Sequence, residues 1–364
     1  MGSLERRSNG PLMKKRVVVI GGGVAGSLSA KLLQDNANVT LIDSKEYFEL
    51  PWATVRSLVE PSFAERSIYN HIDYLKKATV VVSSAANITE TEVITAQGHL
   101  IPYDYLVIAT GHETNGFIKK SDTLSSYHAE SEKIKSAKSI LVIGGGPTGV
   151  ELAGEIAVNY CEKRVILVHR GSRLLEFISP KASKKAFDWL ISKKVDVILD
   201  QHIELDHTEL GVYRTSSGEA IAADCHYDCI GKPMGSTWLK RTIVRNSLDI
   251  NGRLMVDAHL RVKGHKNVFG VGDITDVPEI KQGYLAQRHA KLAVKNLLLL
   301  IKGRGEMKMA VYRPSWPLAI VSLGRKDAVG QFFCLALSGF VPSMMKSRGL
   351  FVANMRKLLG IKPD

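Results

Sequence analysis

The sequence predicts an α/β protein with two Rossmann-like dinucleotide-binding domains and a small C-terminal α+β segment. The main observation is a phosphate-binding signature that occurs twice, as VVVIGGGVAG from Val17 to Gly26 and as ILVIGGGPTG from Ile140 to Gly149. Each copy is a short apolar run followed by a glycine turn and a helix-like stretch. The length of 364 residues is typical of two or three domains. Two nucleotide sites in one chain favour an electron-transfer enzyme that brings a flavin and a nicotinamide together.

The first copy begins with an expected buried parallel strand from Val17 to Ile20, which is continuous, apolar and ended by glycine. Gly21 permits the tight turn, Gly23 lets the backbone approach a pyrophosphate, and Gly26 lets the next helix pack on the strand. That helix is expected from about residue 24 to 33. Its N-terminus points at the phosphates, where free N–H groups and the helix dipole meet negative charge.

An acid follows the next apolar run of this copy. The run from Val39 to Ile42 ends in Asp43, at the distance where a carboxylate accepts hydrogen bonds from a ribose. A glycine turn without a ligand is the alternative interpretation. The strand, the helix and the acid together favour a nucleotide site.

The second copy repeats this layout with Gly144, Gly146 and Gly149. Its next strand, from Arg164 to Val168, ends in His169 and Arg170 where an acid could have stood, and Arg173 follows three residues later. An acid there would repel a 2′-phosphate, whereas His and Arg tolerate or attract one. We therefore expect NADPH to be accepted at least as well as NADH. The alternative is that both arginines belong to a solvated turn.

The rest of the chain predicts further elements of both units. Residues 46–74, with Tyr47, Phe48 and Trp52, form an expected loop-rich segment that either covers a flat ring or belongs to the core. Runs at 79–83, 92–95 and 99–102 suggest a small antiparallel insert. Further expected elements are a buried strand at 103–111, a linker at 112–136, strands at 195–199, 213–215, 224–230, 254–256 and 267–273, and a helix at 284–301.

The C-terminal part of the chain carries most of the net charge. From Lys281 to Asp364 there are 15 Lys and Arg against three acids, which gives 15 − 3 = +12 of the formal +13. Short apolar runs such as 297–301, 332–337 and 340–341 lie among these basic residues. This mixture suits a surface that rests on an anionic membrane. A core-facing hairpin with a solvated basic surface is the alternative, and nucleic acid binding ranks last because few aromatics are placed for base stacking.

The cysteines and the N-terminus exclude other classes. Four cysteines without a Cys-x-x-Cys motif predict neither a disulfide framework nor a dithiol reductase, and they fit a reducing compartment such as the cytoplasm. No metal site is expected. The polar, basic N-terminus has no secretory core, and Arg6 stands where a myristoylation signal requires Ser or Thr. No apolar run is long enough for a transmembrane helix.

Through these motifs in combination, the chain resembles the two-dinucleotide-domain flavoprotein reductases, which have the glutathione-reductase-like fold. The resemblance covers about residues 15–301. It implies that the first motif binds FAD, that the turn Ala109-Thr110-Gly111 lies near the crossing between domains, and that Asp273 of the pair Gly272-Asp273 contacts the flavin ribityl or pyrophosphate.

A closer similarity is to the apoptosis-inducing-factor-like ferroptosis suppressor proteins, relatives of type II NADH:quinone oxidoreductases. It rests on residues 39–45, 54–60, 150–155 and 281–286, and it extends into the tail at 322–325, 330–331 and 346–352. This likeness implies reduction of ubiquinone or a related lipid quinone by NADH or NADPH at a membrane face. The missing acylation signal and the polar strand at 224–230 depart from the pattern.

The resemblance also assigns residues and domains. Glu151 and Lys281 are the expected catalytic residues: Glu151 orients the nicotinamide, and Lys281 stabilises the reduced flavin or a quinone oxygen. Without the resemblance, Glu151 is a helix-dipole acid and Lys281 a solvated lysine. Lys45 and Arg56 join the expected FAD residues, and His169, Arg170 and Gly231 join the NAD(P)H residues. The expected divisions are a flexible N-terminus at 1–15, an FAD-binding domain at 16–120 and 246–305, an NAD(P)H-binding domain at 121–245, and a basic, apolar membrane- or quinone-facing segment at 306–364.

Two other functions stay open at this point. One is reduction of a soluble acceptor, such as monodehydroascorbate or an iron–sulfur protein. The other is a redox-sensing, flavin-binding interaction protein in which turnover is incidental. A homodimer is possible, and the protein is expected to be cytoplasmic and peripherally attached to a membrane.

Overall fold

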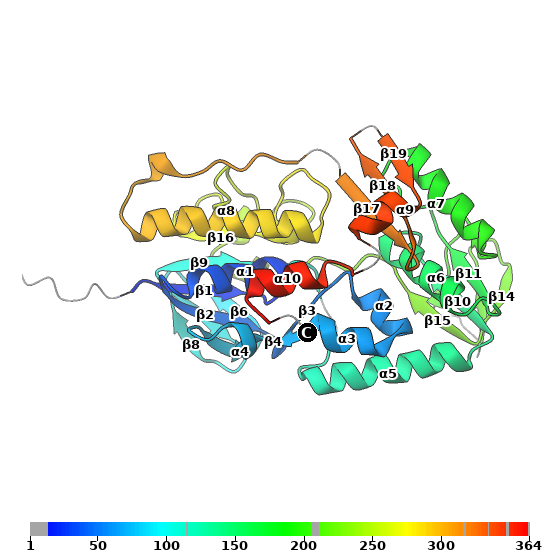
Figure 1. The fold of residues 1–364 in the computed structure, drawn as a ribbon. Coiled ribbons are helices and arrows are strands. Elements are labelled where there is room, and N and C mark those ends of the chain that lie inside the picture. The colour runs from blue at the N-terminus through cyan, green and yellow to red at the C-terminus, as the bar shows by residue number, and fades with distance from the viewer. Residues whose placement is uncertain are drawn as a thin grey trace, which may run out of the picture.

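The structure is a computed structural model that describes residues 14–113, 116–205, 211–315, 318–333, 335–346 and 349–362. Two units lie side by side, the first coloured blue, cyan and yellow and the second green, with the orange and red C-terminal segment reaching across both (Figure 1). The segment 1–15, expected to be flexible, lies almost wholly outside the described residues.

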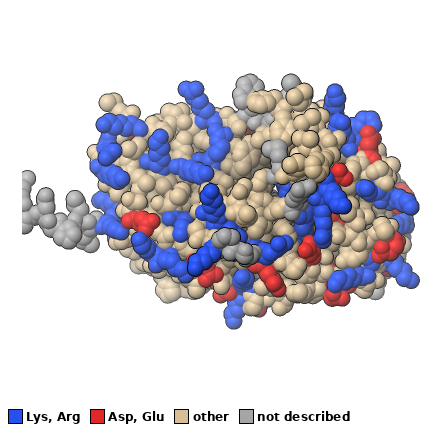
Figure 2. Space-filling view, viewed as in Figure 1, with Lys and Arg blue, Asp and Glu red and all other residues tan. Residues whose placement is uncertain are grey.

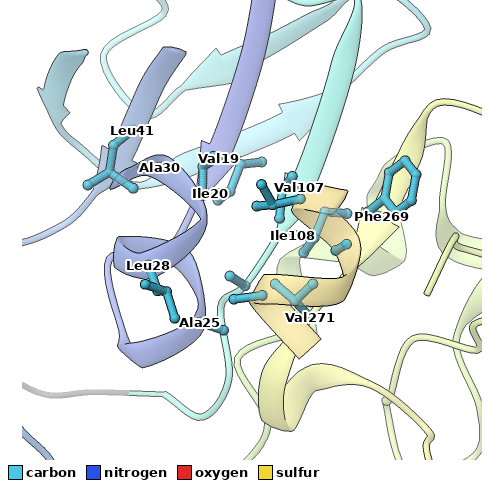
Figure 3. Packing of buried hydrophobic residues seen from close by; sticks show 14 of the residues in the cluster. Val19, Ile20, Ala25, Leu28, Ala30, Leu41, Val107, Ile108, Phe269 and Val271 are labelled. Atoms are coloured by element: carbon cyan, nitrogen blue, oxygen red, sulfur yellow. The ribbon is translucent and has the colours of Figure 1, made fainter. Parts of the chain in front are cut away.

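The first unit is built on a five-stranded parallel sheet with the order β16-β9-β1-β2-β5. Helices α1 and α8 pack against each other beside this sheet, and Leu28, Val107 and Phe269 are among the buried side chains of the core of this unit (Figure 3). Helix α1 begins and ends at the predicted residues. The elements are β1 (Arg16–Ile20), α1 (Val24–Leu33), β2 (Asn38–Asp43), β5 (Thr79–Val82), β9 (Tyr105–Ile108), β16 (Val268–Gly270), the 3₁₀ helix η4 (Gly272–Ile274) and α8 (Gly283–Ile301).

The register of this sheet brings the first glycine turn and the later turns to one edge. Ile20 of β1 pairs with Ile42 of β2 and with Ile108 of β9, and Gly270 of β16 also pairs with Ile108. The carboxyl ends of parallel strands therefore meet there, which is where nucleotides bind in such sheets.

One strand assignment from the sequence is wrong. Thr79–Val82 does not open the antiparallel insert; it pairs in parallel with β2 and forms the edge of the large sheet. The insert is instead β6 (Ala85–Ile88), β7 (Glu92–Thr95) and β8 (Leu100–Pro102). A half-buried edge strand has the same alternating pattern as an antiparallel strand, so the pattern alone could not separate them.

The second unit has a four-stranded parallel sheet with the order β12-β11-β10-β15. The polar strand noted in the sequence is β15, an edge strand, which explains why it tolerates polar residues. Asp224 accepts hydrogen bonds from the backbone of Lys138 and Ser139, and exposed Asp228 accepts one from Ile230. The elements are β10 (Ser139–Ile143), α6 (Pro147–Asn159), β11 (Arg164–Val168), α7 (Pro180–Ser192), β12 (Asp196–Ile198), the hairpin β13 (Val212–Arg214) and β14 (Ala220–Ala222), and β15 (Cys225–Asp228).

Three other expectations are wrong. Residues 46–74 are mostly regular rather than loop-rich, most of the expected linker is the helix α5, and residues 254–256 make isolated bridges rather than a strand. The buried face of α5 consists of Thr123, Tyr127, Ser131 and Ile134. Because two of these are small hydroxyl residues, the helix shows little hydrophobic periodicity in the sequence. The elements are β3 (Tyr47–Glu49), α2 (Thr54–Val59), α3 (Pro61–Ser67), β4 (Ile68–Asn70), α4 (His71–Tyr74) and α5 (Lys120–Ser136).

The chain crosses between the units twice, and the crossings run antiparallel. Gly235 donates its N–H to the carbonyl of Gly111, and Glu113 donates to the carbonyl of Pro233. After the second crossing, the 3₁₀ helices η2 (Thr237–Arg241) and η3 (Arg245–Ser247) follow, and Leu239 packs into the core of the first unit.

The C-terminal segment ties the two units together. Its antiparallel sheet packs against α6 and α7 of the second unit, whereas α10 returns to α1 of the first unit, where Met355 and Leu359 are buried. None of the helices among the described residues is both long and apolar enough to cross a membrane. The elements are η5 (Glu306–Lys308), β17 (Leu318–Leu323), β18 (Asp327–Phe332), β19 (Leu335–Ser338), α9 (Phe340–Met345) and α10 (Val352–Leu359).

A buried ion pair also joins the units, and it predicts a measurable stability effect. Arg56 of α2 lies 2.8 Å from Glu155 of α6, and both side chains are 3% exposed. Removing one partner leaves a buried charge without compensation, so we expect Arg56→Met to lower the free energy of unfolding by about 3–5 kcal/mol in urea titrations.

Arg16→Met is the matched control, because the side chains of the pair Arg16–Asp104 are 48% and 28% exposed and the pair should contribute less than about 1 kcal/mol. The double variant Arg56→Met/Glu155→Met should recover most of the loss. An equal cost for Arg56→Met and Arg16→Met would contradict the interpretation.

Candidate nucleotide-binding sites

The two glycine turns are built in the same way. Gly21 has φ +97° and Gly144 has φ +112°, a conformation that only glycine adopts without strain. Helices α1 and α6 begin shortly after these turns, so their free N–H groups face the same edge as the strand ends.

In each turn the second glycine is held by the side chain that ends the neighbouring strand. The N–H of Gly22 donates to Oδ2 of Asp43, and the N–H of Gly145 donates to Nδ1 of His169 at 3.0 Å. His169 therefore occupies in the second site the place that Asp43 occupies in the first. His169 thus stands at the strand end where an acid equivalent to Asp43 could have stood.

The two residues leave opposite hydrogen-bonding groups for a ligand. The Asp43 carboxylate has only acceptors when ionised, although burial raises its pKa. At His169, Nδ1 accepts from Gly145, so in the neutral ring Nε2 carries the proton and is a donor. Burial lowers the pKa of His169, which favours this neutral form, and its Nε2 is buried and makes no hydrogen bond within the described part of the chain.

The third glycine of each turn tests whether a nucleotide fits. A Cβ atom placed on Gly23 or on Gly146 would meet no protein atom within 4 Å, and neither residue has a positive φ. Packing of the protein therefore does not require glycine there, whereas close approach of a pyrophosphate does. Gly26 and Gly149 differ, because a Cβ on either would collide with the carbonyl of Gly21 or Gly144.

Other predicted FAD residues gather around the first turn. The Ala109 N–H donates to the carbonyl of Ile20, and the hydroxyl of Thr110 is buried without a partner among the described residues. Gly111, with φ +54°, lies at the crossing. These residues and the cradle at Gly23 fit a dinucleotide.

A buried hydrogen-bond network supports the turn at Gly272 and Asp273. Gly272 donates its N–H to Nδ1 of His289, and Nε2 of His289 lies 2.9 Å from Glu279, which also accepts from Tyr312. Burial alone would raise the pKa of Glu279, but hydrogen bonds from His289, Ser315 and Tyr312 hold it below its ordinary value. Asp273 itself lies 3.6 Å from Nδ1 of His112, a residue that the sequence analysis did not single out.

Lys45 and Arg56 have different surroundings. The Lys45 N–H donates to Oδ1 of Asp43, which places Lys45 beside the first turn. The Arg56 guanidinium instead lies against Glu155 of the second unit. Both assignments as FAD ligands stay predictions.

The remaining predicted residues of the second site lie around its rim. Arg170 is exposed, and Gly231 is exposed just beyond the end of β15. Arg173 donates to the carbonyls of Glu176 and Ile178, so its guanidinium stabilises its own loop.

Glu151 lies at a junction between the units that the sequence did not reveal. Its Oε1 accepts hydrogen bonds from Nζ of Lys346 at 2.6 Å and from the N–H of Ser322 at 2.9 Å. The Leu350 N–H donates to the carbonyl of Lys346, and the Leu350 carbonyl accepts from the indole of Trp52 in the first unit. Lys346 thus contacts the second unit, whereas Leu350 contacts the first unit.

Lys281, the other predicted catalytic residue, has separate contacts. Its Nζ donates to the carbonyls of Thr275 and Val277, at 2.8 and 2.9 Å, just before α8. Burial lowers the pKa of Lys281, followed by repulsion from Arg253, so the lysine gives up a proton more readily than a solvated one. Within the described residues, no cluster of three His, Cys, Asp or Glu side chains could hold a metal ion.

Comparison with known proteins gives the chain's relationships. The family model described as pyridine nucleotide-disulphide oxidoreductase matches residues 15–291. Apoptosis-inducing factor homolog B of Dictyostelium discoideum is 32% identical over 93% of this chain and 95% of its own. Ferroptosis suppressor protein 1 of Homo sapiens is 30% identical, and the alignment covers 100% of both chains.

Solved structures share the fold at low identity. The sulfide:quinone oxidoreductase of Aquifex aeolicus has a TM-score of 0.75 at 19% identity, covering 94% of this chain and 92% of that one. NDH2 of Plasmodium falciparum in complex with NADH has a TM-score of 0.74 at 14% identity, covering 95% and 97%.

The hydrogen-bond donor Nε2 of His169 leads to a prediction about which nicotinamide nucleotide the protein uses. We expect His169→Asp to lower the ratio of kcat/KM for NADPH to that for NADH by about tenfold or more, because a carboxylate repels the 2′-phosphate. Steady-state rates with both nucleotides measure this ratio. His128→Asp, which makes the same change on the exposed face of α5, should leave it unchanged. An unaltered ratio in His169→Asp would refute the role of this residue.

Proposed function

The chain belongs to the pyridine nucleotide-disulphide oxidoreductase family and uses FAD with NADH or NADPH, and from this premise we propose that it reduces a lipid quinone at a membrane face. The balanced reaction is NAD(P)H + H⁺ + quinone → NAD(P)⁺ + quinol. Bound FAD supplies the capacity to accept a hydride and to release two electrons. The observation that carries the proposal is the pair of matching glycine turns at the strand ends of two adjoining units, together with the contact between Lys346 and Glu151.

The first unit would hold FAD through its turn. The α1 N-terminus and the open approach at Gly23 suit the pyrophosphate, and Asp43 suits a ribose. Thr110, Gly111 and Asp273 lie at the same strand ends and complete this proposed site.

The second unit, which lies between the crossings at Gly111 and Gly235, would hold NADH or NADPH. Gly146 leaves room for the pyrophosphate, and His169 Nε2 offers a proton to the adenosine ribose or its 2′-phosphate. We propose that both nucleotides are accepted because this donor replaces a carboxylate.

At the junction, the residues of the chain supply charge and a proton. Lys346 donates from Nζ to Glu151 in a short, charge-assisted hydrogen bond, and the partly buried position of this pair strengthens its electrostatic interactions. We assign to Lys346 and Lys281 the task of stabilising negative charge that develops during reduction of the acceptor. Glu151 orients Lys346, and it lies on α6, the helix that follows the glycine turn of the proposed NAD(P)H site.

The acceptor side is argued from an exposed apolar surface, which we call the apolar patch. Figure 2 shows few charged side chains over β17, β18 and α9. The members of the patch are 40% to 64% exposed and lie on or beside β18, β19 and α9: Phe333, Leu335, Leu337, Phe340, Val341 and Met344. Together with the positive charge of the C-terminal part, this patch favours contact with an anionic membrane and a lipid-soluble acceptor.

The experiment below also distinguishes two alternative functions. A soluble acceptor would not need the apolar patch, and a redox-sensing interaction protein would turn over slowly with every acceptor. A homodimer would cover part of this surface.

The function is tested by purifying the protein and following NAD(P)H oxidation with a quinone panel. We expect a yellow protein with a flavin spectrum, and faster turnover of a long-chain quinone in anionic vesicles than of a short-chain quinone in solution. Leu335→Ser/Val341→Ser should lower only the vesicle rate, several-fold, because it weakens membrane contact. Ile72→Ser, equally exposed on the first unit, is the control. A colourless protein that flavin cannot reconstitute would end the proposal, and equal rates in both assays would favour a soluble acceptor.

The junction predicts a separate effect on turnover. We expect Lys346→Met to lower quinone turnover by about tenfold or more while FAD content stays unchanged, because the positive charge at Glu151 is removed. Lys326→Met, an exposed lysine in the turn between β17 and β18, is the matched control. Full turnover in Lys346→Met would remove this lysine from the mechanism.

A further inference from the structure

A buried histidine faces the first glycine turn and has an unused nitrogen. His71 is fully buried, and its Nε2 makes no hydrogen bond within the described residues. This Nε2 lies 4.0 Å from Oδ2 of Asp43, and a Cβ atom placed on Gly22 would lie 2.6 Å from it. The unused nitrogen is therefore at the turn itself, beside the carboxylate that ends β2.

A chain of hydrogen bonds fixes which nitrogen of His71 carries the proton. The carbonyl of Gly22 can only accept, so the Ser27 hydroxyl donates to it at 2.7 Å. Ser27 must then accept from the Tyr74 hydroxyl at 2.8 Å. Because Tyr74 has spent its only proton, it accepts from Nδ1 of His71 at 2.6 Å. Counting donors along this chain places the proton on Nδ1 and leaves a lone pair on Nε2.

The environment keeps the ring neutral. Burial, with the nearby positive charge of Lys45, lowers the pKa of His71 to about 3. At neutral pH the imidazole is therefore uncharged, and Nε2 is an acceptor rather than a donor.

The site thus presents two acceptors, Nε2 of His71 and Oδ2 of Asp43, 4.0 Å apart at one turn. A phosphate would add a third acceptor and a negative charge beside a carboxylate, so it does not fit between them. Two adjacent hydroxyl groups match these two acceptors in hydrogen-bonding character, because each hydroxyl can donate one proton to one acceptor. The adenosine ribose of FAD carries such a pair.

We propose that His71 is a binding residue of the FAD site, where it and Asp43 each accept a hydrogen bond from one of the two vicinal hydroxyls of the adenosine ribose. This inference rests on the proposed function, because it takes FAD as the occupant of the first site. Tyr74 and Ser27 contribute by holding His71 in the tautomer whose Nε2 accepts.

The test measures dissociation constants of the flavin-free full-length protein by flavin fluorescence. We expect His71→Leu to bind FAD about tenfold more weakly than the wild type, which is the loss for one ligand hydrogen bond. Binding of FMN, which lacks the adenosine, should not change. His71→Gln, whose amide oxygen can also accept, should recover part of the loss.

Ligand analogues make the test independent of how the variants fold. The wild type should bind 2′-deoxyadenosine or 3′-deoxyadenosine analogues of FAD more weakly than FAD. His71→Leu should no longer distinguish FAD from the analogue that lacks its partner hydroxyl, and Tyr74→Phe should weaken this discrimination.

Equal binding of FAD and both deoxy analogues by the wild type would overturn the inference, as would equal loss of FAD and FMN in His71→Leu. A wild-type protein that binds no flavin would instead overturn the proposed function.

Discussion

The structure depends on one repeated hydrogen bond, from the middle glycine of each turn to the side chain that ends the neighbouring strand. In the first unit Gly22 donates to Asp43, and in the second Gly145 donates to His169. Each bond holds the turn against the second strand of its sheet and fixes the start of the following helix. Because both sheets have the same register at this edge, both helix N-termini and both open glycines face a ligand in the same way.

The same scaffold offers two different surfaces because the two side chains satisfy the bond differently. A carboxylate that accepts from the turn still has acceptors left, whereas a neutral imidazole that accepts through Nδ1 is left with a donor. A ribose with free hydroxyls suits the first surface, and a phosphorylated or unmodified ribose suits the second. The residue at the end of this strand is therefore one difference between the proposed FAD site and the proposed NAD(P)H site.

Contacts from distant parts of the chain then join the two sites. Lys346 is 195 residues from Glu151 in the sequence, and Leu350 is 298 residues from Trp52. Arg56 and Glu155 add a buried ion pair between α2 and α6. These contacts make the C-terminal segment and α2 part of the junction between the units, rather than appendages to it.

The sequence allowed the two glycine turns, helix α1 and the departure at His169 to be predicted, because each depends on residues within one βαβ unit. The contact between Glu151 and Lys346 and the hydrogen-bond chain from His71 to Gly22 could not be predicted from the sequence. Their residues are distant along the chain and come together only in the folded structure. Helix α5 escaped notice because its buried face contains hydroxyl residues, and β5 was misplaced because edge strands of either kind alternate in the same way. The roles assigned to individual residues and the limits of the domains remain predictions.

The central claim is that one chain has two independent nucleotide sites, and calorimetric titration of FAD and NADP⁺ into the variants Gly23→Ala and Gly146→Ala tests it most directly. A Cβ at either position meets open space in the protein, so both variants should fold like the wild type. We expect Gly23→Ala to bind FAD at least about tenfold more weakly with NADP⁺ affinity unchanged, and Gly146→Ala to show the reverse. Unchanged FAD binding in Gly23→Ala, or loss of both ligands in either variant, would contradict the account.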